Sequence, residues 1–390
     1  MKMEGCRKDF PILKDGKLIY FDNACMTLKP KQVIDAVTGY YTEYSACGDR
    51  AHHRLGKRVT EEVAKSRNTL RKFINARKDE DIIFTKNATE AINLVANGLG
   101  LNRSDKVLTT DREHNSNLLP WQRCKAKHEV FNVEDEIDLD SFEEQAQGTR
   151  LVSFPHICNM DGMVLPVKDM IKRAHKQGAL VLVDAAQSVP HTEVDVRSLD
   201  ADFIAFSGHK MCGPTGTGVL YGKKELLEGL SPLLLGGDTV LDSTYESYTL
   251  AGLPSRLEAG LQNYAGIIGF GQAAAYLKKI GLSKIEKHET ALNQQLKRGI
   301  KSIKNVRLLG PENSSGITGF MAEGIDPHNI AMLLDQTANI MVRSGQHCVH
   351  SWFNSRGLPG SVRASLYLYN TAEEVETFIN QLSKVLSKIS

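Results

Sequence analysis

The stretch Val183–Gly222 reads VDAAQSVPHTEVDVRSLDADFIAFSGHKMCGPTGTGVLYG, and it contains two short apolar runs that each end in polar residues. Asp184 ends the first run, and Lys210 follows the second after Ser207, Gly208 and His209. Two such runs with a helix-length connection are typical of neighbouring strands in a parallel sheet. Ligands of these sheets bind at the carboxyl ends of the strands, so we expect the functional residues at this edge.

The same alternation of apolar runs and amphipathic helical patterns extends from about Leu18 to Gly222. It predicts an α/β fold with a mainly parallel sheet. The predicted strands are Asp81–Thr85, Lys106–Thr110, Arg150–Phe154, Ala179–Asp184 and Asp202–Phe206. Polar residues that could take part in catalysis or binding lie at or after the strand ends: Thr89, His114, Asn159, Asp184, Ser207, His209 and Lys210.

The pattern of predicted helices and strands changes after about residue 260. Two long helical patterns come first, then a smaller α+β region, and finally a helix in which Thr371 and Glu374 have the spacing of a capping box. We therefore expect a large domain over residues 15–260 and a small C-terminal domain over residues 261–390. Residues 1–14 are expected to pack against the small domain.

Composition excludes several classes of protein. Apolar residues make up 41% and charged residues 24%, and the formal net charge is only +2, so nucleic acid and anionic membranes are not expected as partners. No segment approaches the roughly 18 apolar residues of a membrane-spanning helix, and we expect a cytoplasmic protein.

The cysteines argue against a disulfide framework and against zinc, because the seven are scattered without a C-x-x-C pair. No metal site is expected. A packing role is predicted for four of them: Cys25, Cys47, Cys158 and Cys212.

Lys210 alone could bind phosphate, lie on the surface or anchor a cofactor, and its surroundings favour the cofactor. A pyridoxal phosphate ring needs an acid that keeps its nitrogen protonated, which Asp184 can supply, and Gln187 can reach the ring oxygen. His114 can cover one face of the ring. A helix start and side-chain donors suit the phosphate, and the residues expected there are Ala88, Thr89, Ser207 and His209.

Seven motifs, in order along the chain, extend this hypothesis to a family. They are YFDNA, TEAINLVA, EHNSNLLPWQ, VDAAQSVPH, DFIAFSGHKMCGPTGTGVLYG, RSGQHC and VRASLYLYNTAEEV, between Tyr20 and Val375. With them the chain resembles the class V aminotransferase group of fold type I pyridoxal-phosphate enzymes. Within that group it resembles the cysteine desulfurase and selenocysteine lyase family.

The resemblance implies a role for each matching residue. Lys210 would carry the cofactor covalently and shuttle protons, and His114 would stack on the ring and assist protonation. Asn159 would lie beside the ring and the substrate carboxylate, which Arg363 would clamp with its planar guanidinium. Cys348 of RSGQHC would be the nucleophile. Arg343 is expected near the substrate, and Arg343 and His347 could favour the thiolate as cationic neighbours.

The function implied is that of a homodimeric cysteine desulfurase, which converts L-cysteine to L-alanine and forms a persulfide on Cys348. A sulfur-acceptor or scaffold protein would receive the sulfur for iron–sulfur cluster or other sulfur-containing cofactor synthesis. Three alternatives stay open: a selenocysteine lyase, a cysteine lyase that releases free sulfide, and a non-catalytic scaffold.

The chain departs from the family pattern at three places. EAGLQN stands where EAGTPN is common, so that Leu261 replaces a threonine that reaches the phosphate of a neighbouring subunit. NATE replaces a turn with paired threonines, and QHC replaces His-His-Cys. The departure at Leu261 puts phosphate binding across a subunit interface in doubt.

Overall fold

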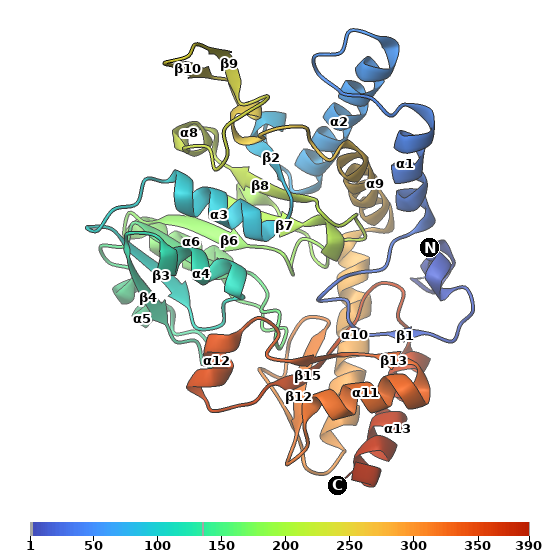
Figure 1. Cartoon of the computed structure of the whole chain (residues 1–390). Coiled ribbons are helices and arrows are strands. Elements are labelled where there is room, and N and C mark those ends of the chain that lie inside the picture. Colours follow the sequence, from blue (N-terminus) through green and yellow to red (C-terminus); the bar gives the residue numbers. More distant parts are fainter. Residues whose placement is uncertain (1–2, 135, 390) are drawn as a thin grey trace.

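A seven-stranded sheet forms the centre of the computed structural model, which describes residues 3–134 and 136–389 (Figure 1). The strand order is β2-β8-β7-β6-β5-β3-β4. Four neighbouring pairs, from β7–β6 to β3–β4, are parallel, whereas β8 is antiparallel to both of its neighbours. The strands are β2 Ile82–Thr85, β3 Lys106–Thr110, β4 Lys127–Phe131, β5 Leu151–Pro155, β6 Leu180–Asp184, β7 Phe203–Ser207 and β8 Gly218–Gly222. The predicted α/β fold is confirmed, and the five predicted strands each match within one residue.

Both faces of this sheet are covered, which explains why its central strands β5, β6 and β7 are mostly apolar on both faces. Leu182 of β6 packs into one hydrophobic core, whereas its neighbours Val181 and Val183 pack into another on the opposite face. The first core is completed by α3 Ala88–Gly98, α4 Leu119–Arg123 and α8 Lys224–Gly229. The second is completed mainly by α5 Leu139–Gln145, α6 Val167–Lys176, α7 Val196–Leu199 and α9 Tyr264–Ile280.

A second, smaller sheet has the order β11-β12-β15-β14 and is antiparallel. Its strands are β11 Val306–Leu308, β12 Ile317–Ala322, β14 Arg343–Gly345 and β15 Ser361–Ser365. Helices of this C-terminal region are α10 Leu282–Lys301, α11 Pro327–Ala338, α12 His350–Ser355 and α13 Ala372–Ile389. The predicted capping box starts α13, because Glu374 N donates to Thr371 Oγ1 at 3.2 Å and Thr371 N donates to Glu374 Oε2 at 3.2 Å.

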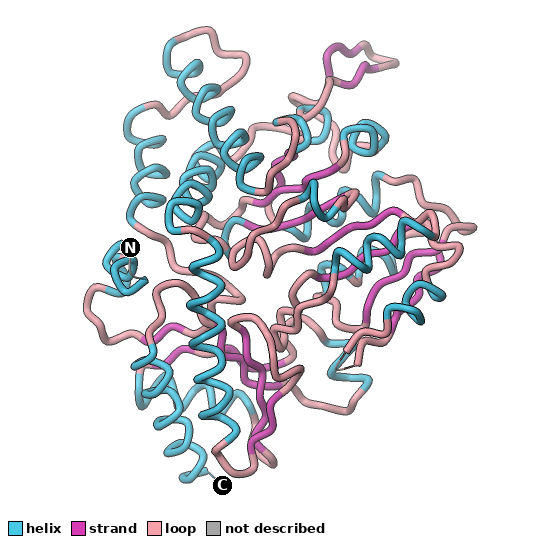
Figure 2. The backbone as a smooth tube through the Cα atoms, turned by 180° about the vertical axis from the view of Figure 1, so that it is seen from behind, coloured by secondary structure: helices cyan, strands magenta, loops and turns pink. Residues whose placement is uncertain are grey.

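The remaining elements lie at the edges of these two layers. Helices α1 Lys31–Glu43 and α2 Arg54–Phe73 pack on α9, and a hairpin of β9 Val240–Ser243 and β10 Tyr248–Leu250 stands away from the body of the molecule (Figures 1 and 2). Strand β1 Ile19–Tyr20 pairs in parallel with β13 Ile340–Met341. Short 3₁₀ helices span Met3–Asp9, Pro11–Leu13, Asp79–Asp81, Asn115–Asn117, Gly208–Lys210 and Ser255–Leu257.

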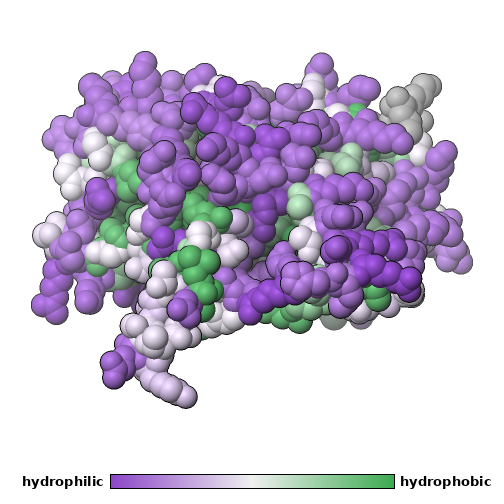
Figure 3. All heavy atoms as spheres, turned by 90° about the horizontal axis from the view of Figure 1, so that it is seen from above, coloured by the Kyte–Doolittle hydropathy of each residue, from purple (hydrophilic) through white to green (hydrophobic). Residues whose placement is uncertain are grey.

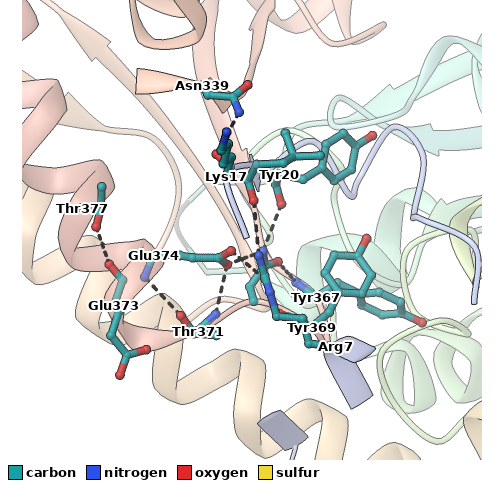
Figure 4. Close-up of polar contacts among 12 residues, drawn as sticks. Arg7, Lys17, Tyr20, Asn339, Tyr367, Tyr369, Thr371, Glu373, Glu374 and Thr377 are labelled. Carbon is teal, nitrogen blue, oxygen red and sulfur yellow. Dashed lines mark hydrogen bonds and ion pairs between the residues drawn. The ribbon is translucent and has the colours of Figure 1, made fainter. Parts of the chain in front are cut away.

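The start of the chain is tied to its end (Figure 4). Arg7 donates to the carbonyl of Tyr369 at 3.0 Å and forms an ion pair with Glu374 at 2.6 Å. Phe10 packs edge-on against Tyr369, with ring centroids 4.6 Å apart, and Asn339 donates to the carbonyl of Lys17 at 2.8 Å. The division at residue 260 stays a prediction, and two elements bridge it: β1 pairs with β13, and α9 packs on α1 and α2.

In the part of the chain that the structure describes, no helix is long and apolar enough to cross a membrane.

Gly218 at the start of β8 sets how closely that strand approaches the start of α3. A Cβ at this position would lie 2.6 Å from the Cα of Asn87. We predict that Gly218→Ala destabilises the protein by about 1–3 kcal/mol, because backbone must move to relieve the overlap. Thermal melting measures this, with Gly229→Ala as the control, since a Cβ there meets nothing within 4 Å. Equal melting temperatures for the two variants would contradict this packing.

Candidate active site

A cavity of about 210 Å³ lies where β5, β6 and β7 end, between the large sheet and the C-terminal region. The structure brings every residue predicted for the site onto its wall: Ala88, Thr89, His114, Asn159, Asp184, Gln187, Ser207, His209, Lys210, Arg343, Cys348 and Arg363. The sequence did not single out Asn87 and Ser116, although both lie in the quoted motif regions. It also did not assign a site role to Ala24 or Cys25.

Asp184 and Lys210 meet because β6 and β7 are parallel neighbours. Asp184 is the last residue of β6 and pairs with Ala205, and the 3₁₀ turn Gly208–Lys210 follows β7 directly. Burial raises the pKa of Asp184 and the charge of Lys210 opposes this, while burial lowers the pKa of Lys210 and Asp184 opposes it. A lysine whose pKa is lowered has more of the neutral amine that can act as nucleophile or base.

The N-terminus of α3 forms one end of the cavity. Asn87 caps this helix by accepting from Glu90 N at 2.9 Å, and Ala88 N donates to Ser207 Oγ at 2.9 Å. The hydroxyls of Thr89 and Ser116 lie 2.7 Å apart. A helix N-terminus attracts anions through its free N–H groups and its dipole, so this end can hold a phosphate.

His114 has a defined protonation state. Its Nδ1 accepts from Ser116 N at 3.1 Å, which leaves the proton of the neutral ring on Nε2. Burial, and secondly the charge of Lys210, lower the pKa of His114 to about 3. The ring is therefore neutral at pH 7 and offers an Nε2–H donor on the cavity wall.

Two arginines from the small sheet face each other across β14 and β15. Arg363 is only 3% exposed; it donates to the carbonyl of Asn159 at 2.9 Å and pairs with Asp22 at 3.3 Å. Its Nε is buried and finds no hydrogen-bond partner among the described residues. Arg343 is the cross-strand partner of Arg363, is half exposed, and lies 3.8 Å from the other oxygen of Asp22. The two guanidinium groups make this side of the cavity positive, and the Nε–H of Arg363 is left to donate to a carboxylate.

Cys348 lies on a turn in which two successive residues have left-handed backbone conformations, with φ of 51° at His347 and 59° at Cys348. Asn159 Nδ2 donates to the carbonyl of His347 at 2.8 Å, and Asn115 N donates to that of Cys348 at 2.7 Å. The turn is thus fixed to the large sheet while the Cys348 residue stays exposed.

The expectation that His347 is a cation beside Cys348 is wrong. Burial, and secondly the charge of Arg363, lower the pKa of His347 to about 2, and its Nε2 lies 2.8 Å from Ser361 Oγ. His347 is therefore a neutral, hydrogen-bonded side chain. Arg363 and Arg343 are charged neighbours of the turn, and both line the cavity.

The side chains around the cavity fit pyridoxal phosphate. Gln187 Nε2 donates to the carbonyl of Ala24 at 2.7 Å, which leaves its second N–H and its buried, unpartnered Oε1 for a ligand. The carboxylate of Asp184, the amine of Lys210 and the N-terminus of α3 are the groups that a pyridinium, an aldehyde and a phosphate require. Within residues 3–134 and 136–389, no group of three or more His, Cys, Asp or Glu could hold a metal ion.

The comparison with known families agrees with this chemistry. Residues 19–378 match the model of aminotransferase class V, and the chain belongs to the class V aminotransferase family. Its relatives include probable cysteine desulfurases of Pyrococcus abyssi, 42% identical over 99% of this chain and 98% of that protein, and of Streptomyces coelicolor, 40% identical over 98% and 96%.

Solved structures give the same picture. An apo cysteine desulfurase from Thermococcus onnurineus superimposes with a TM-score of 0.94 at 41% identity, covering 99% of this chain and 98% of that one. A cysteine desulfurase from Escherichia coli gives 0.93 at 31% identity, covering 100% and 99%. The predicted membership of the cysteine desulfurase group and the predicted fold are confirmed.

The protonation state of His347 gives a pH prediction for the protein without cofactor. Its pKa is about 2 in the folded state and about 6.5 in the unfolded state, so its contribution to stability is present above pH 6.5 and is lost as pH falls toward 2. Between pH 6 and pH 5 the unfolding free energy of wild type should fall more than that of His347→Gln, a variant that keeps a partner for Ser361. We predict a difference of up to about 1.4 kcal/mol over this pH unit. Urea unfolding at several pH values measures this, and identical slopes would refute it.

Proposed function

We propose that this chain is a cysteine desulfurase that converts L-cysteine to L-alanine and stores the sulfur as a persulfide on Cys348. The observation that carries the proposal is that one cavity is lined by a partly buried amine, Lys210, and by an exposed cysteine, Cys348. Relatives that are named cysteine desulfurases and align over nearly their whole length support it.

The chain is a pyridoxal-phosphate enzyme, and the bound cofactor supplies an electron sink for negative charge at the substrate Cα. Asp184 would lie against the ring nitrogen and Gln187 against the ring oxygen. His114 would cover the ring with its neutral imidazole. The start of α3, with Ala88 and Thr89, would hold the phosphate together with Ser207 and His209.

The substrate is oriented by its carboxylate. Arg363 has a buried donor that finds no partner within residues 3–134 and 136–389, Asn159 lies against it, and Arg343 adds a second positive charge at the more exposed side. A bidentate guanidinium fixes a carboxylate in one plane, which aligns the Cα–H bond of cysteine. Lys210 then removes the Cα proton, and the Nε2–H of His114 is placed to return a proton.

Sulfur transfer needs a thiolate that can approach the substrate sulfur. Cys348 Sγ forms the new sulfur–sulfur bond while the carbon–sulfur bond of the substrate breaks, and protonation of that carbon completes alanine. Asn159 and Asn115 hold the backbone of the turn, so the Cys348 side chain extends from a backbone of fixed position.

A homodimer, a cytoplasmic location and a protein that accepts the sulfur complete the proposal. Apolar side chains reach the surface among polar ones (Figure 3). Several of them lie on and beside the β9–β10 hairpin, where a second copy of the chain would cover them: Leu234, Leu235, Leu241, Tyr245, Tyr248 and Leu261. Leu261 is 72% exposed and has no hydroxyl to donate, so it would contribute apolar contact there and no phosphate ligand. The sulfur would serve iron–sulfur cluster or other sulfur-containing cofactor synthesis.

Lys210→Ala tests the role of the amine. We predict loss of the covalently held cofactor and a fall in alanine formation of at least about a hundredfold to ten-thousandfold, because anchor and base vanish together. Absorbance of the purified protein and an alanine assay measure the two effects. Lys301→Ala, an exposed lysine paired with Glu312, is the matched control. Near-normal turnover in Lys210→Ala would refute the assignment.

Cys348→Ser tests the desulfurase mechanism against its alternatives. We predict that the variant still binds cysteine but forms no protein-bound sulfane sulfur, whereas Cys47→Ser, which changes an exposed cysteine outside the cavity, forms it normally. Intact mass after exposure to L-cysteine measures the added sulfur. If wild type releases sulfide without ever carrying a persulfide, the protein is a sulfide-releasing lyase. Greater turnover of selenocysteine than of cysteine by wild type would instead indicate a selenocysteine lyase.

A further inference from the structure

The cavity contains a second thiol that the mechanism above does not use. Cys25 lines the same cavity as Lys210 and Cys348. A packing role was predicted for it, and burial in the core agrees with that role for Cys158 and Cys212, which are 1% and 0% exposed. Cys25 differs from these two, because it is only partly buried and lies on the cavity wall.

The backbone around Cys25 is held in place from several directions. Cys25 N donates to the carbonyl of Asp22 at 3.2 Å. Ala24 N donates to Ser365 Oγ at 2.9 Å, and the carbonyl of Ala24 accepts from Gln187. The carbonyl of Met26 accepts from Tyr20 at 2.8 Å. These contacts fix the position of the Cys25 backbone at the cavity.

The charges around Cys25 belong to the catalytic groups. Burial lowers the pKa of Lys210 and of Arg363; Asp184, Cys25 and Cys348 oppose this at Lys210, and Asp22 and Cys25 oppose it at Arg363. Both thiols therefore lie near the same amine on the wall of one cavity.

We propose that Cys25 is a second sulfur-accepting residue, which takes the sulfane sulfur from the persulfide of Cys348. The inference rests on the proposed function, because that function supplies the persulfide. The Cys348 turn is exposed and Cys25 is partly enclosed, so the transfer carries sulfur inward to a thiol that outside reductants reach less easily.

The step balances without any oxidant or reductant. The Cys25 thiolate attacks the terminal sulfur of the Cys348 persulfide, a new sulfur–sulfur bond forms at Cys25, and the bond at Cys348 breaks. Cys348 leaves with the electron pair of that bond as a thiolate, and the proton lost by Cys25 matches the one gained by Cys348. The freed Cys348 can then accept sulfur from a second cysteine, so one chain stores two sulfane sulfurs.

The test uses the holoenzyme treated with excess L-cysteine in the absence of acceptor and reductant, followed by intact mass and peptide mapping. We expect about two sulfane sulfurs per chain in wild type and in Cys47→Ser, on Cys25 and Cys348, and a twofold lower load in Cys25→Ser, on Cys348 alone. Cys25→Ala is a second variant that replaces Cys25→Ser if serine disturbs folding. Cys348→Ser should carry no sulfur on Cys25.

Three results would overturn the inference while leaving the proposed function intact. These are sulfur on Cys348 but none on Cys25 in wild type, equal labelling of Cys25 in Cys348→Ser, and a Cys25–Cys348 disulfide formed with release of sulfide. A wild-type protein whose Cys348 never carries sulfur would refute the proposed function as well.

Discussion

The structure depends on two opposite charges at the ends of neighbouring strands, Asp184, which is buried, and Lys210, which is partly buried. Removing either charge from water costs several kcal/mol, and their attraction across the β6–β7 edge offsets part of this cost. The arrangement requires parallel pairing in one register, with Asp184 opposite Ala205. A slip by one residue would turn the carboxylate to the other face of the sheet and into an apolar core.

The smaller sheet completes the site with residues far away in the sequence. Arg363 reaches the carbonyl of Asn159, Asn159 reaches the carbonyl of His347, and Asn115 holds the carbonyl of Cys348. These contacts join the end of β15 and the nucleophile turn to loops that follow β3 and β5. Thus the side that binds a substrate carboxylate and the side that binds a cofactor are aligned by the same few hydrogen bonds.

Local patterns predicted the sheet and the polar residues after its strand ends, whereas Arg343, Cys348 and Arg363 were predicted only from the resemblance to the family. Buried strands such as β6 are apolar up to their last residue, here Asp184, and polar residues at and after strand ends converge wherever the sheet is parallel. The edge strand β4 was missed because it is only partly buried and has no clear apolar run. Strand β8 was not among the predicted strands either, and its antiparallel direction depends on a turn that pattern alone does not define. The neutral state of His347 and the cavity position of Cys25 depend on burial by distant segments, which no local pattern reports.

The tie between the first and last segments of the chain has a consequence for biosynthesis. Asp22 and Ser365 form an isolated parallel β-bridge, in which Ser365 N donates to the carbonyl of Phe21 at 2.7 Å. Ala24 N donates to the hydroxyl of the same serine. Domains generally fold from the N-terminus while the ribosome is still adding residues. The Ala24 N–H and the Phe21 carbonyl nevertheless have to wait for Ser365 of β15, which is translated more than three hundred residues later. The large sheet can form on the nascent chain, but the wall of the cavity closes only when synthesis is nearly finished, so capture of the cofactor is a late event in the maturation of the protein.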